Sequence, residues 1–253
     1  EHVRAQVADT DSTGFCNVTG GSRTTFATGM AVTRACEDVI AECKKRAAMT
    51  WGLDEDQVEW EDGQAIPGPG VNADVKPLSL ANLAGKAAKT GGPIQGRASL
   101  NAQGAGASFS VNFGDLRVDQ ETGKVDVLSY TAVQDAGKAI HPAYVEGQMQ
   151  GGAAQGLGWA LNEEYIFNDQ GVLENPGFLD YRIPVCSDLP MIDTAIVEVA
   201  NPSHPYGVRG VGETPIVAPL AVATNAVSRA IDKRVGELPL SPPNLLDVID
   251  GDE

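Results

Sequence analysis

The spacing of apolar residues predicts three substantial helices. One helical pattern runs from about Phe26 to Met49, and a second, rich in glycine, runs from about Pro142 to Leu161. Residues Ile216 to Ile231 are rich in Ala, Val and Leu, which predicts a buried helix. Because Pro219 cannot donate a backbone hydrogen bond, we expect this third helix to begin a few residues later than its pattern does.

Alternation of apolar and polar residues predicts strands in the second half of the chain. Ser108 to Val118 and Val125 to Val133 both alternate and are separated by a short polar turn, so they predict an antiparallel hairpin. Glu163 to Asn168 and Thr194 to Ala200 predict further strands. The acidic end, Asp247 to Glu253, predicts a frayed tail.

These elements predict an α+β fold in which mixed sheets pack with helices. We expect two interleaved lobes that divide near residue 100. The first, residues 1–100, contains the long N-terminal helix. The second, residues 101–253, contains the hairpin and the two later helices.

Composition restricts the class of function. The 253 residues carry a formal net charge of −16, which disfavours binding to nucleic acid or to an anionic membrane. Neither a secretory signal nor an apolar run of transmembrane length is visible, so we expect a cytoplasmic protein without membrane insertion. The four cysteines contain no C-x-x-C pair and the three histidines are scattered, so we expect no metal site built from side chains.

A glycine-rich segment that ends in one carboxylate is the first candidate site. Gly207, Gly210 and Gly212 lead directly to Glu213, and Thr-Pro follows as a helix start, with the threonine as its cap. An acid between a glycine turn and a buried helix is a candidate general base. The alternative is a structural glutamate that the helix dipole stabilises.

Two other segments have the chemistry of a binding site. Gly20, Gly21, Ser22 and Arg23 precede the long helix, where free N–H groups and a guanidinium could hold an anion. The alternative is a simple helix cap supplied by the threonines that follow.

The glycine-rich helix is the other such segment. It carries Gln148, Gln150 and Gln155, whose amides suit the edge of a heterocycle. Packing against another helix would explain its glycines but not its glutamines.

Three segments taken together resemble the C-terminal half of the molybdopterin-binding subunit of the xanthine oxidase family of molybdenum hydroxylases. In order, they are Asp9-Thr10-Asp11 with Thr19-Gly20-Gly21-Ser22-Arg23; Asp135-Ala136-Gly137-Lys138-Ala139-Ile140-His141-Pro142 with Glu146-Gly147-Gln148 and Gln155-Gly156-Leu157-Gly158; and Gly210-Val211-Gly212-Glu213 with Pro215, Asn225-Ala226-Val227 and Leu238-Pro239. Their order and spacing extend over nearly the whole chain.

The resemblance implies roles for these residues. Gly20, Gly21, Ser22 and Arg23 match the loop that holds the pterin and its phosphates, and Gln148 and Gly212 are expected beside the same cofactor. Glu213 matches the active-site glutamate beside the molybdenum. The metal would be held by the cofactor's own sulfurs, which agrees with the lack of a side-chain metal site.

The resemblance also implies an activity and partners. It implies oxidation of a C–H bond of an aldehyde or an N-heteroaromatic compound with oxygen from water, and the residues do not separate these substrates. The cofactor would be molybdopterin with molybdenum, including its cytosine dinucleotide form. Iron–sulfur clusters and FAD would lie on partner chains, namely an iron–sulfur subunit and a FAD or cytochrome subunit. An upstream molybdopterin-binding half would complete the site, with residues 91–106 and 147–158 as its expected contacts. The alternative is a non-catalytic assembly or maturation subunit with the same fold.

Overall fold

The chain forms two compact units. The structure is a computed structural model that describes residues 3–12, 14–72, 74–104 and 106–251. The larger unit comprises Glu1–Thr24, Gly106–Asn201 and Gly207–Glu253, and the smaller comprises Thr25–Ala105 and Pro202–Tyr206. The chain passes from the smaller unit to the larger unit at residues 105–106, near the expected division at about residue 100. The segment 1–24, however, belongs with the C-terminal residues, whereas the expected first lobe included it.

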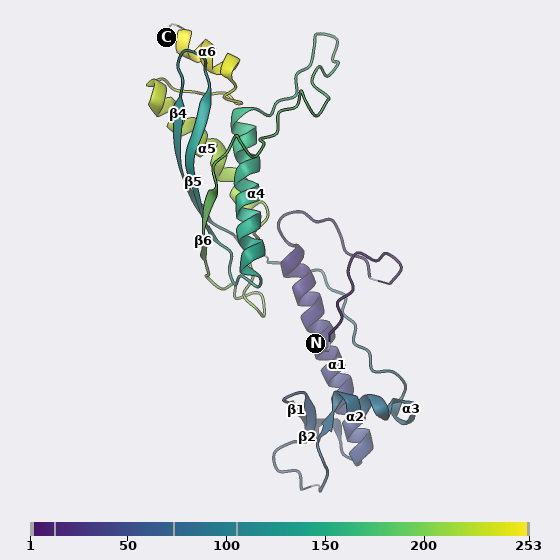
Figure 1. Ribbon diagram of the computed structural model, residues 1–253. Helices are drawn as coiled ribbons and strands as arrows, with labels where there is room; N and C mark the ends of the chain where they lie inside the picture. The colour runs from purple at the N-terminus through teal and green to yellow at the C-terminus, as the bar shows by residue number, and fades with distance from the viewer. Residues whose placement is uncertain (1–2, 13, 73, 105, 252–253) are drawn as a thin grey trace. The chain divides into compact units, whose positions relative to one another are not determined.

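The smaller unit consists of a long helix and a small sheet (Figure 1). Its elements are α1 (Thr24–Trp51, of which Thr24 is assigned to the larger unit), η1 (Glu55–Gln57), β1 (Val58–Glu61), β2 (Gln64–Pro67), β3 (Leu78–Ser79), α2 (Leu80–Gly85) and α3 (Ala87–Thr90). The antiparallel sheet has the order β1-β2-β3. Cys43 of α1 packs with Val58 and Leu83 in the core, so this cysteine has a packing role.

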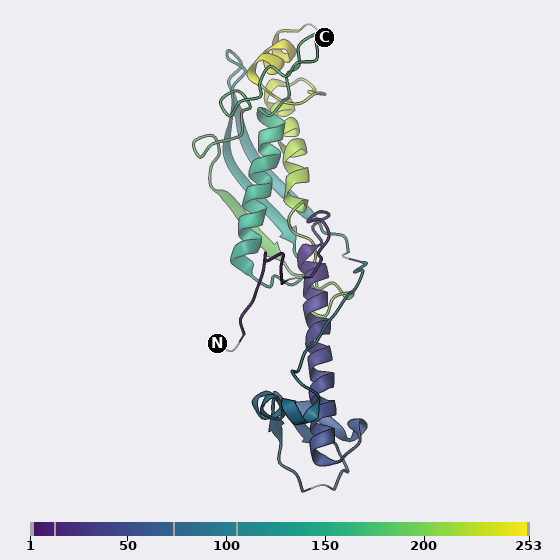
Figure 2. The same ribbon diagram turned by 90° about the vertical axis from the view of Figure 1, so that its right-hand side faces the viewer.

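The larger unit places two helices on one face of a three-stranded sheet (Figure 2). Its elements are β4 (Ser110–Val118), β5 (Val125–Asp135), α4 (Pro142–Leu161), β6 (Ile192–Val197), α5 (Thr214–Ile231) and α6 (Pro242–Asp250). The sheet order is β4-β5-β6, with β5 antiparallel to β4 and parallel to β6. Tyr130 and Ala132 of β5 pack in the core with Met149 and Leu157 of α4 and with Val227 of α5.

Glycines in α4 allow α5 to approach closely. A Cβ atom added at Gly152 would lie 2.5 Å from the ring of Pro215, and one added at Gly156 would lie 2.5 Å from the carbonyl oxygen of Ile216. Helix packing therefore accounts for these two glycines. Pro219 does not delay the helix, because α5 begins at Thr214 and contains this proline as a buried contact of Gly156.

Most of the predicted elements are confirmed, including the hairpin, α1 and α4. The predicted strand at Glu163–Asn168 is wrong, because this backbone bonds within its own loop: Glu174 N–H donates to Ile166 O at 2.7 Å. The last strand lies slightly earlier than predicted, at Ile192–Val197. The predicted tail is helical as far as residue 250, and residues 252–253 lie outside the described residues.

No helix in the described part of the chain is both long enough and apolar enough to cross a membrane.

Candidate functional site

Glu213 and the glycine loop are joined by a reciprocal pair of hydrogen bonds. The backbone N–H of Glu213 donates to Ser22 Oγ at 2.8 Å, and the backbone N–H of Gly21 donates to Glu213 Oε1 at 3.2 Å. Glu213 is exposed and is the N-cap residue of α5, the position that was expected for the threonine after it. Two segments about 190 residues apart therefore meet in the larger unit, with the carboxylate against the loop.

The loop has a backbone shape that needs small residues around it. Gly21 and Ser22 have φ angles of +63° and +53°, so two successive residues adopt the left-handed conformation. A Cβ atom at Gly210 would lie 2.7 Å from Ser22 Cβ, so only glycine lets the two segments approach this closely. By contrast, a Cβ atom at Gly20 or Gly21 would have no other heavy atom within 4 Å. The backbone of these two residues is open to a ligand.

Gln148 projects from α4 toward the same place. A Cβ atom at Gly212 would lie 3.3 Å from Gln148 Oε1 and 3.7 Å from Ser22 Oγ. No hydrogen bond connects the Gln148 side chain to another described residue. Of the other two glutamines in this helix, Gln150 has a structural role, since its Nε2 donates to Ile192 O at 3.0 Å. Gln155 is exposed elsewhere on α4.

Arg23 directly precedes α1 and is half-buried. Among the residues that the structure describes, none forms a hydrogen bond or ion pair with its guanidinium. This cation therefore has its full set of donors for an anionic ligand.

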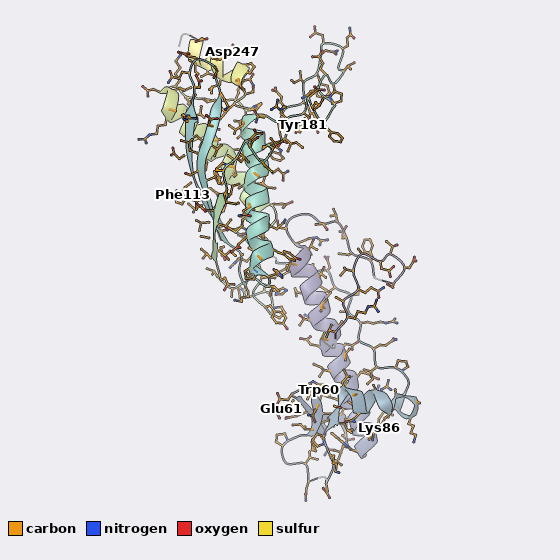
Figure 3. The ribbon with its side chains drawn as sticks, viewed as in Figure 1. Trp60, Glu61, Lys86, Phe113, Tyr181 and Asp247 are labelled. Carbon is orange, nitrogen blue, oxygen red and sulfur yellow. The ribbon has the colours of Figure 1, made fainter. Side chains whose placement is uncertain are left out.

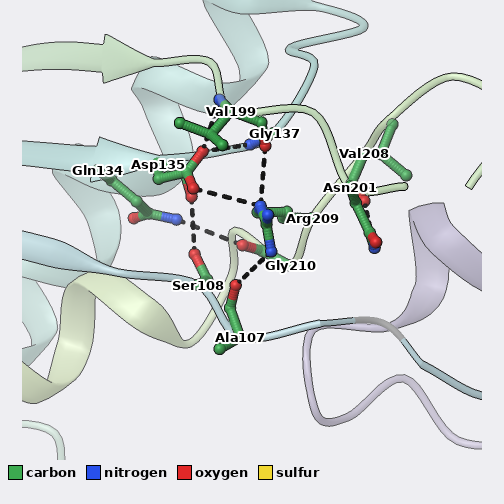
Figure 4. A network of polar contacts seen from close by, with 10 residues as sticks. All are labelled: Ala107, Ser108, Gln134, Asp135, Gly137, Val199, Asn201, Val208, Arg209 and Gly210. Atoms are coloured by element: carbon green, nitrogen blue, oxygen red, sulfur yellow. Dashed lines mark hydrogen bonds and ion pairs between the residues drawn. The ribbon is translucent and has the colours of Figure 1, made fainter. Parts of the chain in front are cut away.

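A buried ion pair anchors the segment that leads to Glu213 (Figure 4). Arg209 Nε lies 3.2 Å from Asp135 Oδ2, with 13% and 11% of the two side chains exposed. The other carboxylate oxygen, Asp135 Oδ1, accepts hydrogen bonds from the N–H groups of Gly137, at 2.9 Å, and Val199, at 3.1 Å. Arg209 also donates to the carbonyl groups of Val199 and Ala107. These charges are thus paired and hydrogen-bonded, as buried charges must be.

Gln134 extends this network toward the site. Its Nε2 donates to the carbonyl oxygens of Gly210 and Val211, each at 3.4 Å. The residue is 1% exposed, and its Oε1 has no hydrogen-bond partner. Sequence reasoning gave Gln134 no role. The sequence did contain one indication of its role. In the alternating pattern of β5, Gln134 occupies the same inward face as Tyr130 and Ala132, where a polar side chain needs a partner.

The residues at this site fit an anionic cofactor that brings its own metal. They offer open backbone at Gly20 and Gly21, the unpaired guanidinium of Arg23 and the unpaired amide of Gln148. Within the described ranges, no group of three or more His, Cys, Asp or Glu side chains is arranged to hold a metal ion. The site therefore provides hydrogen-bond donors and one carboxylate.

Comparison with known proteins identifies the family. The profile of the molybdopterin cofactor-binding domain matches residues 1–190. The chain belongs to this family. The xanthine dehydrogenase molybdenum-binding subunit of Escherichia coli O157:H7 is 37% identical over 172 residues, which are 66% of this chain and 23% of the relative. The carbon monoxide dehydrogenase large chain of Hydrogenophaga pseudoflava is 29% identical over 251 residues, which are 96% of this chain and 30% of the relative.

A solved structure shows the same fold. The Cu,Mo-CO dehydrogenase, in its carbon monoxide reduced state, matches with a TM-score of 0.78 and 25% identity, covering 95% of this chain and 31% of that one. The resemblance to the xanthine oxidase family of molybdenum hydroxylases and the α+β fold are thereby confirmed. These relatives are oxidoreductases with partner subunits, and this chain spans less than a third of their length.

Proposed function

We propose that this molybdopterin-binding domain is the C-terminal portion of a molybdenum hydroxylase that oxidises a C–H bond of an aldehyde or an N-heteroaromatic substrate. When bound, the molybdopterin cofactor supplies the redox chemistry that adds oxygen from water to the substrate carbon. The observation that carries the proposal is the joining of Glu213 to the glycine loop. It puts the one carboxylate of the site beside the groups suited to hold the cofactor.

Glu213 is the general base in this proposal. Its Oε1 is bonded to Gly21 N–H, while no described residue bonds to its Oε2, which leaves that oxygen to accept a proton. A general base must lie within hydrogen-bond reach of the proton that it takes. The hydrogen bond from Gly21 holds the carboxylate in place, so its orientation is fixed before substrate arrives.

The groups around Glu213 would hold the cofactor. The backbone N–H of Gly20 and the Arg23 guanidinium suit the phosphates, including those of a cytosine dinucleotide form, while the N–H of Gly21 is occupied by Glu213. The amide of Gln148, close to Gly212, suits the pterin edge.

The proposal includes partners, because the site is open on several sides. An upstream molybdopterin-binding half would complete it, and electrons would leave through iron–sulfur clusters to a FAD or cytochrome subunit. The relatives are themselves parts of complexes with more than one chain.

The test is Glu213→Gln in the assembled complex, because this change keeps the shape and removes the basicity. We expect turnover to fall at least about a hundredfold, the usual contribution of a general base. Molybdenum content should stay unchanged. Glu121→Gln, in the exposed turn between β4 and β5, is the matched control and should leave both unchanged. Wild-type turnover in the Glu213 variant would remove this residue from the mechanism.

A second reading is a non-catalytic assembly or maturation subunit that retains the fold. The retention of Glu213 and of the loop from Gly20 to Arg23, joined by hydrogen bonds, argues against it. Molybdenum content per purified complex distinguishes the two. A substrate panel of aldehydes, N-heterocycles, xanthine and carbon monoxide, with a dye as electron acceptor, would then identify the substrate class.

A further inference from the structure

One face of the β4-β5-β6 sheet is apolar and uncovered. Strand residues alternate between faces, and Tyr130, Ala132 and Gln134 point inward beneath α4 and α5. The residues between them belong to the opposite face. There, Val111 is 58% exposed and Phe113 is 61% exposed, and Figure 3 shows Phe113 on the outer side of the sheet.

The strand register joins these side chains into one surface. Val111 pairs with Val133, and Val133 pairs in turn with Ala195. Two residues further along β4, Phe113 pairs with Thr131. We call this surface the open sheet face, and it comprises Phe109, Val111, Phe113, Val133, Ala195 and Val197. It extends across all three strands and contains two phenylalanines, Phe109 and Phe113, which are 66% and 61% exposed.

Such a face indicates a partner. Monomeric soluble proteins rarely expose a continuous apolar patch of more than a few hundred Å², and larger patches mark interaction sites. The two helices already occupy the other face, so no further element of this unit covers the phenylalanines.

Charge argues against a second copy of this chain as the occupant. Asp115 and Asp193 stand beside Phe113 at one end of the face, both exposed and neither in an ion pair with a described residue. Two copies docked through this face would each bring two carboxylates and a net charge of −16 to the contact. A partner with basic residues opposite the two aspartates would be favoured instead.

We propose that the open sheet face docks the polypeptide that supplies the rest of the molybdopterin site, corresponding to the more than two thirds of the relatives that this chain does not cover. This inference rests on the proposed function. It adds this face to the expected contacts, since within the 147–158 segment Gly152, Gly156 and Gly158 are buried against other residues of this unit while Gly147 and Gly151 stay open. In the 91–106 segment, residue 105 lies outside the described residues.

The first test is photo-cross-linking in the assembled complex. Benzoylphenylalanine replaces Phe113 in the full chain, the complex is irradiated in the cells that make it, and the joined peptides are sequenced. The expected cross-link is to a polypeptide of the molybdopterin-binding family. Met49 is the control position. Its side chain is 58% exposed, like that of Val111, but it lies in the smaller unit. A cross-link to a second copy, to a site within residues 1–253 of the same chain or to an iron–sulfur or flavin chain would overturn the proposal, as would none above the control.

The second test measures assembly. Val111→Glu should lower recovery of that polypeptide with the tagged chain at least about tenfold, which corresponds to ~1.4 kcal/mol. Met49→Glu should not. Phe113→Ser removes apolar contact without adding charge, so it keeps the test decisive if Val111→Glu fails to fold. Unchanged recovery with a folded variant would overturn the proposal. Glu213→Gln should leave recovery intact, so failure of the interface and failure of the catalytic role are separate results.

Discussion

At the residue scale, the site depends on a few side chains in specific environments. Ser22 accepts the hydrogen bond from Glu213 N–H while holding a left-handed backbone conformation that is uncommon for a residue with a side chain. Such conformations persist only where the surroundings fix them, and they concentrate at functional sites. Here, the absence of a side chain at Gly210 provides the room.

Arg23→Ala should weaken cofactor retention more than folding. The guanidinium has no polar partner among the described residues, so its removal breaks no hydrogen bond or ion pair with them. We expect lower molybdopterin content per complex with nearly the same melting temperature. Arg117→Ala, which removes an exposed arginine paired with Asp126 in the hairpin, is the control and should keep full content. Full content in the Arg23 variant would show that the loop does not use this residue.

His204 should make the smaller unit less stable in acid. Burial lowers the pKa of its imidazole below the usual 6.5, and its Nδ1 accepts a hydrogen bond from Tyr206 N–H at 3.0 Å. The unfolded chain therefore binds the proton more tightly, and stability is lost as pH falls below about 6.5. Urea unfolding at pH 7 and pH 5 would measure this loss. His204→Gln should make the dependence shallower, and an identical slope in both proteins would contradict the assignment.

At the element scale, the contact between α4 and α5 determines where the site residues lie. Gln148 is on α4 and Glu213 caps α5, so the spacing of these helices sets the spacing of the two side chains. The spacing is small because Gly152 and Gly156 lie against Pro215 and Pro219.

Gly156→Ala should destabilise the larger unit by about 1–3 kcal/mol, the usual cost of overpacking. The new methyl group would meet the backbone oxygen of Ile216, which cannot easily move. Gly151→Ala, in the same helix but with open space around it, should instead be neutral or gain up to about 1 kcal/mol from helix propensity. Thermal unfolding of both variants is the measurement. If the Gly156→Ala and Gly151→Ala variants were equally stable, α5 would have to shift to accommodate the new methyl group.

The sequence predicted these elements unevenly, for physical reasons. The helix at Pro142–Leu161 and the hairpin have strong periodicity, so their pattern was sufficient. The segment around Ile166 has a strand-like composition but no partner strand, which only the tertiary structure reveals. The acidic end forms α6 because Leu245 is buried against the body, and a local count of charges does not detect that contact.

The sequence pointed to the members of the proposed site but not to the connections between them. Glycines and an acid at Gly20–Arg23 and Glu213 carry local signals of binding and catalysis. The hydrogen bonds between them join distant residues, so no spacing rule could reveal them. The same holds for the support from Gln134 and for the pair of Asp135 with Arg209.

At the scale of the whole molecule, the proposed function makes the chain one part of a larger catalytic assembly. Its site residues all belong to the larger unit, and they approach the cofactor position from the glycine loop, α4 and the start of α5. Ligand sites usually bury most of their ligand, which these three segments cannot do for a cofactor the size of molybdopterin.

Residues 1–253 produced alone should therefore bind less than stoichiometric molybdenum. Metal analysis of the purified chain, with its mass measured by light scattering, is the experiment. Producing the partner polypeptide in the same cells should restore the metal content. A stable monomer that carries one molybdenum and oxidises substrate unaided would contradict the need for a second half.

The bond between Ser22 and Glu213 also sets an order of events during synthesis. These residues are 191 positions apart, and a ribosome adds about 5–20 residues per second, so Ser22 emerges roughly 10–40 seconds before its partner. The glycine loop has no Glu213 to hold it during that interval. Under the proposed function, insertion of the cofactor would follow translation of the segment that contains Glu213, and a ribosome stalled before Glu213 would carry a nascent chain whose glycine loop lacks this partner.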